Sequence, residues 1–260
     1  MNIDLTGKRV IVCGASKGIG LAAARQLATL GAEVTLVARN QVALESALAT
    51  LDQPTRHHIL VADFQAPLDL QKLVAVHVAQ HGPIHVLVNN TGGPTPGPIL
   101  AATLEQFQSA FTQHLLCNHV LALAVIPGMK SENYGRIVNV ISTSVKAPIP
   151  GLGVSNTIRA AVAAWAKTLS AEVAPFGITV NNVLPGATDT DRLAEIIANK
   201  AAKSGKSVAD IEAQEAAAIP AGRFAKPEEL AAAIAFLSSP AAAYINGVNL
   251  PVDGGRTGCL

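Results

Sequence analysis

Short apolar runs and longer helix-like segments alternate along this chain. We expect the runs to be strands, and they are Arg9–Cys13, Glu33–Ala38, Ile59–Ala62, Ile84–Asn89, Arg136–Ile141, Ile178–Val183 and Val248–Val252. Strands that read as continuous apolar runs are typical of a parallel sheet that helices cover on both faces. The alternation therefore predicts an α/β fold with a doubly wound, parallel, seven-stranded sheet.

The expected helices lie between these runs, at Gly20–Leu30, Gln41–Leu51, Leu68–Gln80, Leu104–Met129, Thr157–Val173 and Pro227–Leu237. No stretch rich in serine, glycine or charge resembles a linker, so we expect residues 1–260 to form a single domain. The segment Asp189–Ala221 interrupts the alternation with an additional helical pattern. An insertion before the last strand is where a mobile lid would lie, at about residues 189–221.

Composition excludes several classes of protein. Half of the residues are hydrophobic, 14% are charged and the formal net charge is +1, which argues against a disordered chain and against binding of nucleic acid or membrane by bulk charge. The longest apolar runs, such as Leu121–Ile126, are far shorter than the roughly 20 residues of a membrane span. The start of the chain lacks a signal-peptide pattern. Cys13, Cys117 and Cys259 are scattered, which fits reduced thiols and a cytoplasmic protein without a metal site.

A glycine-rich loop follows the first expected strand and precedes a helix. The loop contains Gly14, Ser16, Lys17, Gly18, Ile19 and Gly20. Glycines permit a tight turn and close approach of the backbone to a pyrophosphate, and the helix N-terminus offers free N–H groups. A plain turn is the alternative, but the strand–loop–helix context favours a nucleotide site.

The second expected strand ends at Arg39, where an acidic residue would hold an adenosine ribose. An arginine there suits a 2′-phosphate, and Lys17 is expected to reach the same group, so NADP(H) is favoured over NAD(H). Two solvated surface cations are the alternative. Asp63 follows the third strand, beside Phe64, and is expected either to cap the next helix or to contact the adenine.

Several motifs in series resemble the short-chain dehydrogenase/reductase family, in particular its β-ketoacyl-acyl-carrier-protein-reductase-like members. They are the glycine loop, Asn89-Asn90-Thr91-Gly92, Ser142, Pro185-Gly186 and Val252-Asp253-Gly254-Gly255. The resemblance implies a Rossmann-type enzyme, dimeric or tetrameric, that moves a hydride between a nicotinamide and a carbonyl or alcohol. It implies that Asn90, Gly92, Pro185, Gly186, Thr188 and Thr190 help to hold the cofactor. Asp189 or Thr190 as a helix N-cap is a compatible alternative.

The catalytic positions depart from the family pattern. The family's Tyr-x-x-x-Lys pair falls on Ser155 and Arg159, and its helix asparagine falls on His114, so only Ser142 retains its usual identity. Thr91 stands where the family usually has alanine. Reduction of a carbonyl needs a proton donor, and a serine hydroxyl is a far weaker acid than tyrosine.

Two other residues at these positions have suitable chemistry. Arg159 keeps a positive charge and fork-like donors, and is expected to hold the nicotinamide ribose. His114 is a candidate proton donor, because imidazole titrates near pH 6.5. Its structural alternative is a histidine that merely satisfies a backbone carbonyl.

Two hypotheses follow. The first is an NADP(H)-dependent reductase of atypical active site, in which Ser142 polarises the carbonyl, Arg159 holds the ribose, and Ser155 or His114 relays the proton. The second is a catalytically silent NADP(H)-binding protein that acts as a sensor or partner subunit. The loops Gly92–Pro98 and Ala147–Val154 are rich in proline and apolar residues, which favours a carbonyl substrate with an acyl or ring portion. The long helices are compatible with a homodimer or homotetramer.

Overall fold

The computed structural model describes residues 1–259, and within them seven parallel strands form one sheet. The strands are β1 (Arg9–Cys13), β2 (Glu33–Ala38), β3 (His58–Val61), β4 (Val86–Asn89), β5 (Gly135–Val140), β6 (Ile178–Pro185) and β7 (Asn249–Val252). Their order across the sheet is β3-β2-β1-β4-β5-β6-β7, and every pair is parallel. The predicted Rossmann-type sheet is therefore confirmed, and each strand lies within two residues of its expected bounds.

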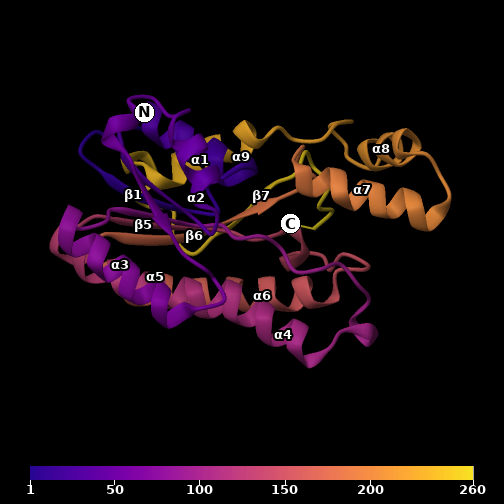
Figure 1. The fold of residues 1–260 in the computed structure, drawn as a ribbon, viewed down its shortest axis with the longest axis horizontal. Coiled ribbons are helices and arrows are strands. Elements are labelled where there is room, and N and C mark those ends of the chain that lie inside the picture. Colours follow the sequence, from indigo (N-terminus) through magenta and orange to yellow (C-terminus); the bar gives the residue numbers. More distant parts are fainter. Residues whose placement is uncertain (260) are drawn as a thin grey trace.

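Helices cover both faces of the sheet (Figure 1). One layer contains α1 (Gly18–Thr29), α2 (Gln41–Leu48) and α9 (Pro227–Ser238), and the other contains α3 (Pro67–His81), α5 (Cys117–Ser131) and α6 (Gly153–Val173). Successive residues of a strand point to opposite faces, so Val10 and Val12 of β1 pack with the first layer while Ile11 packs with the second. Two fully buried cores result, one on each side of the sheet.

The expected helix Leu104–Met129 is broken into three parts. α4 (Leu104–Phe111) is followed by one turn of π-helix at Thr112–Leu116 and then by α5. A π turn holds more residues than an α turn and so changes which side chains face inward, and such turns are frequent at functional sites. The turn carries His114, which is buried.

By length and composition, the whole helical segment Leu104–Ser131 is apolar enough to cross a membrane, with a mean hydropathy of 1.3 in its best window. It is the one such segment among the described residues. The uninterrupted apolar runs of the sequence did not indicate it, because polar residues interrupt the segment while its average stays apolar. Buried core helices have the same composition, and α5 buries Leu121, Val125 and Met129 in the second core.

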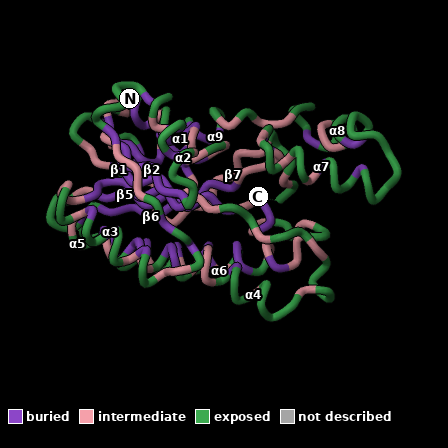
Figure 2. The backbone as a smooth tube through the Cα atoms, in the orientation of Figure 1, coloured by how far each residue is buried: buried purple, intermediate pink, exposed green. Residues whose placement is uncertain are grey.

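The segment after β6 forms an arm. It contains α7 (Asp191–Ser204) and α8 (Val208–Ala217), which project from one end of the molecule (Figure 1). Most residues of the arm are exposed, whereas the central strands of the sheet are buried (Figure 2). A small apolar cluster, centred on Ile197 and Ile211, holds the two helices together.

A chain of asparagine side chains crosses the sheet. Asn89 Nδ2 donates to Asn139 Oδ1 at 2.8 Å, Asn139 Nδ2 to Asn182 Oδ1 at 2.9 Å, and Asn182 Nδ2 to Asn249 Oδ1 at 2.8 Å. Each pair is also matched in strand register, from β4 to β7. These amides link the four strands from β4 to β7 and help to fix their register.

Candidate functional site

The glycine loop lies at the carboxyl end of β1, where the chain leaves the middle of the sheet. β1 pairs with both β2 and β4, so the connections on its two sides run in opposite directions. Such a switch point is where open α/β sheets bind their ligands. The sequence prediction for the position of the site therefore agrees with the topology.

Two glycines of the loop have no room for a side chain. A Cβ on Gly14 would lie 2.3 Å from the carbonyl oxygen of Asn90, and Gly14 has φ +60°. A Cβ on Gly20 would lie 2.2 Å from the carbonyl oxygen of Gly14. Asn90 Nδ2 donates to the carbonyls of Cys13 at 3.3 Å and Gly14 at 3.4 Å. The loop is thus held tightly against the start of α1 and the end of β4.

The N-terminus of α1 has free donors. Lys17 is its N-cap residue, and no side chain of the described chain caps this helix. The first N–H groups of α1, with the positive end of the helix dipole, therefore point to where a pyrophosphate would lie. Together with the close glycine backbone, these donors fit the diphosphate of a dinucleotide.

The two cations expected at a 2′-phosphate differ in their surroundings. Arg39 follows β2 and is exposed, without an ion pair to any described residue. Lys17 Nζ lies 2.9 Å from Asp191 Oδ2, an ion pair that the sequence did not predict. The hydrogen bond with Asp191 raises the pKa of Lys17. Lys17 thus links the glycine loop to the arm.

Asp63 does not cap a helix. Its Oδ1 accepts from the N–H of Gln65 at 3.0 Å, while the N-cap residue of α3 is Ala66, with no side-chain cap. Of the two roles expected for Asp63, the cap is therefore wrong, because the helix begins three residues later than a cap at 63 requires. Phe64 is buried, and its carbonyl accepts from Cys117 Sγ at 3.0 Å.

Arg159 is a buried cation on α6. Its Nη1 donates to the carbonyl of Val140, the last residue of β5, at 3.0 Å, and a Cβ on Gly93 would lie 3.8 Å from Nη2. Its Nε has no hydrogen-bond partner, and no carboxylate of residues 1–259 forms an ion pair with it. Burial lowers the pKa of Arg159 to about 10, so the group remains charged at neutral pH.

His114 forms a buried pair with Thr91. Its Nδ1 lies 2.7 Å from Thr91 Oγ1, whereas its Nε2 is buried without a partner among the described residues. Burial, and then the charge of Arg159, lower the pKa of His114 well below its ordinary value. His114 is therefore neutral at neutral pH. A histidine that satisfies a backbone carbonyl, the structural alternative, is not what the geometry shows.

The two candidate serines occupy different elements. Ser142 is half-buried at the end of β5 and starts the short helical turn Thr143–Val145, where its Oγ accepts from the N–H of Ser144 at 3.1 Å. Because Oγ accepts there, its hydroxyl proton is left to be donated elsewhere. Ser155 is half-buried in the first turn of α6, and this helix begins at Gly153, four residues earlier than expected.

Backbone hydrogen bonds join two loops of the candidate site to each other. The N–H of Gly97 donates to the carbonyl of Gly151 at 2.7 Å, and the N–H of Gly153 to the carbonyl of Gly97 at 3.0 Å. The loops Gly92–Pro98 and Ala147–Val154, predicted separately as walls of the pocket, are thus one paired wall. Gln113 Nε2 also donates to the carbonyl of Gly92 at 3.1 Å.

The loop after β6 closes another side of the site. A Cβ on Gly186 would lie 2.7 Å from Asp253, so Pro185-Gly186 is packed against the segment after β7. Thr190 caps α7 by accepting from the N–H of Leu193 at 3.4 Å, which confirms the N-cap alternative. Its Cγ2 also lies close to Gly18, because a Cβ added to Gly18 would meet that methyl at 3.4 Å. Thr190 therefore lies next to the glycine loop.

The arm is tied to the pocket wall and borders a cavity. Arg192 Nη2 donates to the carbonyl of Pro94 at 2.9 Å. A cavity of about 210 Å³ lies beside the loop after β6 and is lined by Asp189, Leu193, Ala194, Ile197, Glu212 and Phe224. The partners Thr91, Gln113 and Arg192 were not predicted, because no spacing in the sequence shows which loops meet across the edge of the sheet.

The chain is similar to known proteins over nearly its whole length. The family model described as Enoyl-(Acyl carrier protein) reductase matches residues 14–257. A 3-oxoacyl-[acyl-carrier-protein] reductase of Vibrio cholerae is 33% identical over 255 residues, covering 97% of this chain and 98% of the relative. Gluconate 5-dehydrogenase of Gluconobacter oxydans is 32% identical over 263 residues, covering 98% and 96%. The structure of L-sorbose reductase from Gluconobacter frateurii, complexed with NADPH and L-sorbose, matches with a TM-score of 0.94 at 30% identity over 100% of both chains.

Proposed function

Because the chain belongs to the short-chain dehydrogenase/reductase family, we propose that it is an NADP(H)-dependent oxidoreductase that reduces a carbonyl substrate at an atypical active site. The observation that carries this proposal is the buried guanidinium of Arg159, which has no carboxylate partner among the described residues. In this proposal the guanidinium lies near the carbonyl oxygen on which reduction develops negative charge.

An unpaired buried cation is costly for a fold. Removing such a group from water costs several kcal/mol, which a partner of opposite charge normally offsets. Among the described residues, Arg159 has only the carbonyl of Val140 as a hydrogen-bond partner, and its Nε has none. His114, whose pKa the charge of Arg159 lowers, also has a buried Nε2 without a partner there. Buried polar atoms without partners are rare and are expected where a ligand completes them. The two unpartnered nitrogens, Arg159 Nε and His114 Nε2, therefore favour the binding of a molecule that brings oxygen atoms to them.

The chain's own residues have distinct roles in the proposed reaction. NADPH, when bound, supplies the hydride. As hydride arrives at the carbonyl carbon, negative charge develops on the carbonyl oxygen, and the Ser142 hydroxyl donates a hydrogen bond to it. The charge of Arg159 stabilises the same oxygen through a low-dielectric medium, and its fork of donors holds the ribose.

The proton donor is the part of the proposed site that differs from the family pattern. His114 is neutral at neutral pH and does not act as an imidazolium acid. A neutral imidazole can still relay a proton, accepting it at one nitrogen and releasing it from the other, and Thr91 Oγ1 is the partner at Nδ1. We propose that the Ser155 hydroxyl gives its proton to the carbonyl oxygen as the hydride adds to the carbonyl carbon. Ser155 then regains a proton that enters from water and passes along Thr91 and the neutral His114, so that His114 ends as neutral as it began.

The choice of cofactor is supported by Arg39, which is exposed at the end of β2 and free to pair with a 2′-phosphate. It is also supported by the NADPH in the L-sorbose reductase structure. The relatives act on different carbonyl compounds or alcohols, so we propose only a small carbonyl substrate with an acyl or ring portion. We further propose a homodimer or homotetramer located in the cytoplasm.

NADPH binding and turnover must be measured separately. Fluorescence titration gives the dissociation constant, and absorbance follows NADPH oxidation with a panel of ketones and β-ketoacyl thioesters. We expect Arg159→Met to weaken binding and abolish turnover, and His114→Ala to reduce turnover with binding retained. Unchanged turnover in His114→Ala would rule out a relay role for His114. Failure of the native protein to bind NADPH would rule out the proposed function.

A catalytically silent NADP(H)-binding protein is the second candidate, favoured by the absence of a tyrosine at Ser155 and by the neutral His114. The double variant Ser155→Tyr/Arg159→Lys restores the family's acid–cation pair. If the native protein binds NADPH without turnover while the double variant turns over, the silent role is supported. Native turnover with the panel would exclude it.

A further inference from the structure

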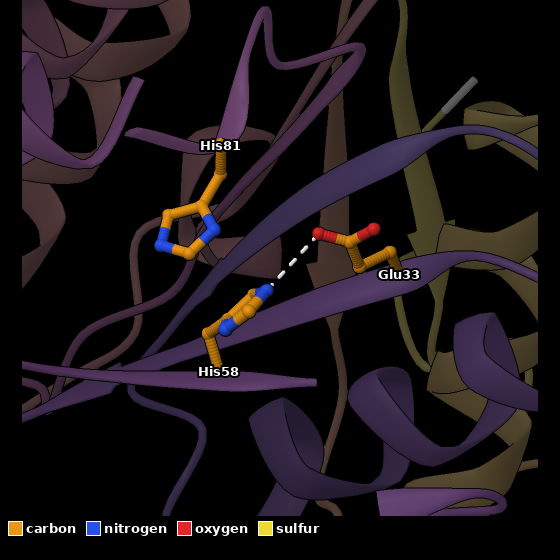
Figure 3. Close-up of side chains that lie close together, drawn as sticks. All are labelled: Glu33, His58 and His81. Carbon is orange, nitrogen blue, oxygen red and sulfur yellow. Dashed lines mark hydrogen bonds and ion pairs between the residues drawn. The ribbon is translucent and has the colours of Figure 1, made fainter. Parts of the chain in front are cut away.

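Three side chains with metal-binding atoms meet far from the glycine loop. Glu33, His58 and His81, here called the Glu-His-His cluster, each offer one ligand atom, and these atoms all lie within 4.8 Å of one another. His58 Nε2 and Glu33 Oε1 are 3.1 Å apart. Figure 3 shows the three side chains arranged around a common space, with the dashed line between His58 and Glu33. All three are half-buried and so accessible to an ion from solvent.

The fold builds this cluster from three elements. Glu33 begins β2, and Thr35, two residues later, lies on the same face of that strand. His58 is the register partner of Thr35 on β3, so its side chain lies on that face too. His77 and His81 stand four apart near the end of α3, on one face of the helix. Thr35 Oγ1 lies 2.8 Å from His77 Nε2, which brings that helix face against the strands.

The neighbouring histidines already have other partners. His57 Nδ1 accepts from the N–H of Val34 at 3.1 Å, and its Nε2 lies 2.7 Å from the carbonyl of Asp52. His77 is buried and bonded to Thr35. In contrast, no hydrogen bond within residues 1–259 holds the ring of His81, whose centroid lies 4.0 Å from that of His58. The two half-buried imidazoles and the carboxylate are thus the groups that remain for a ligand.

The chemistry of these groups selects the class of ligand. Two imidazole nitrogens and one carboxylate oxygen, with an open position for water, form a common four-coordinate site for Zn²⁺. With metal–ligand bonds of about 2.1 Å, neighbouring ligand atoms of a tetrahedron lie about 3.4 Å apart. The His58–Glu33 separation of 3.1 Å is slightly shorter than this, so a small opening of that pair and a rotation of the unbonded His81 ring would complete the set.

We propose that the Glu-His-His cluster binds Zn²⁺. The ion would join the start of β2, the edge strand β3 and the C-terminal end of α3. These are the amino ends of the parallel strands, whereas the glycine loop and Arg159 lie at the carboxyl ends. The site is therefore separate from the proposed oxidoreductase chemistry, and its role is to hold the edge strand in place.

The test uses the full chain, free of any affinity tag and treated with a chelator. Zn²⁺ is titrated by calorimetry, and Co²⁺ is added in a parallel experiment to detect the visible absorption of a four-coordinate site. Thermal unfolding is recorded with and without Zn²⁺. The variants are His81→Gln and Glu33→Gln, with His119→Gln, an exposed histidine of α5, as the matched control. Circular dichroism confirms that each variant is folded.

We expect the native chain and the control to bind one Zn²⁺ with micromolar or tighter affinity, to show the Co²⁺ spectrum, and to unfold at a higher temperature with Zn²⁺. His81→Gln and Glu33→Gln should bind more weakly by at least the roughly 10–100-fold that loss of a supporting outer-shell group costs. Absence of binding by the native chain overturns the proposal. So does binding that both cluster variants retain unchanged, because the ion would then lie elsewhere.

Discussion

At the scale of the residue, Gly20 shows how a missing side chain shapes the nucleotide site. Alanine is normally the better helix former, by about 1 kcal/mol. In α1, however, a Cβ on Gly20 would lie 2.2 Å from the backbone of Gly14, which has no freedom to move because Asn90 holds it. We therefore expect Gly20→Ala to lower the free energy of unfolding and to abolish NADPH binding, measured by urea unfolding and fluorescence titration.

Gly258→Ala is the matched control for this variant, since no described residue lies within 4 Å of a Cβ there. It should leave both quantities unchanged. A Gly20→Ala protein of native or higher stability that binds NADPH normally would contradict the close contact between α1 and the loop.

The residues of the candidate site came from the resemblance to the family, whereas their partners could not be predicted. Fitting the family's motif to this sequence gave His114, Ser155 and Arg159, and the structure puts Arg159 close enough to His114 for its charge to lower the pKa of that histidine. The sequence did not show that Arg159 lacks a counter-ion or that burial keeps His114 neutral. Both properties depend on which distant groups surround the side chain, and local spacing does not contain that information.

At the scale of the element, the asparagine chain makes the four strands from β4 to β7 depend on one another. Asn139 is fully buried and both donates and accepts within the chain. We expect Asn139→Leu to leave Asn89 Nδ2 and Asn182 Oδ1 unsatisfied, each at a cost of about 1–3 kcal/mol in the free energy of unfolding. Chemical denaturation measures this loss.

The matched variant is Asn249→Leu at the half-buried end of the same chain. It removes a single bond, and water can reach that end, so its cost should be clearly smaller. Equal costs for the two variants would show that the amides act separately and not as a connected series.

The elements differ in how readily they are predicted. Apolar runs gave the strands to within two residues, because burial on both faces leaves few alternatives. The π turn at Thr112–Leu116 could not be predicted, since the same residues also suit a continuous α-helix. The hydrogen-bond pattern there is decided by the packing of α4 and α5 against other elements and not by local propensity.

At the scale of the whole molecule, buried neutral histidines make the fold sensitive to acid. Burial lowers the pKa of His77 and of His85 to about 4, and lowers that of His114 as well. In the unfolded chain these groups bind a proton below about pH 6.5, whereas in the folded chain they do not. Stability should therefore fall as the pH falls from 7 to 5, by about 1–2 kcal/mol for each histidine.

Urea unfolding at several pH values measures this slope. His85→Asn keeps an acceptor for the N–H of Arg9, which His85 Nδ1 now accepts at 3.0 Å, but removes the titrating ring. The variant should show a shallower loss of stability in acid, whereas the exposed His119→Asn should retain the native slope. If the free energy of unfolding of His85→Asn falls with pH as steeply as that of the native protein, His85 does not contribute to the loss of stability in acid.

The doubly wound parallel sheet followed from the alternation of strands and helices, whereas the order of its strands and the Glu-His-His cluster did not. Its members come from residues 33, 58 and 81, and no motif spacing relates them. Only the register of β3 against β2 and the rotation of α3 bring them together. Sites assembled from several elements in this way become visible when the register is known.

The first turn of α7 touches two walls of the pocket, through Lys17–Asp191 and through Arg192 with the carbonyl of Pro94. The side chains of the Lys17–Asp191 pair are 69% and 70% exposed, and pairs of this kind contribute only about 0–1 kcal/mol. Because this pair contributes so little free energy, we expect it to open often and more readily in high salt. The residence time of a molecule bound in the pocket should then depend on its own contacts with the pocket walls and not on this ion pair.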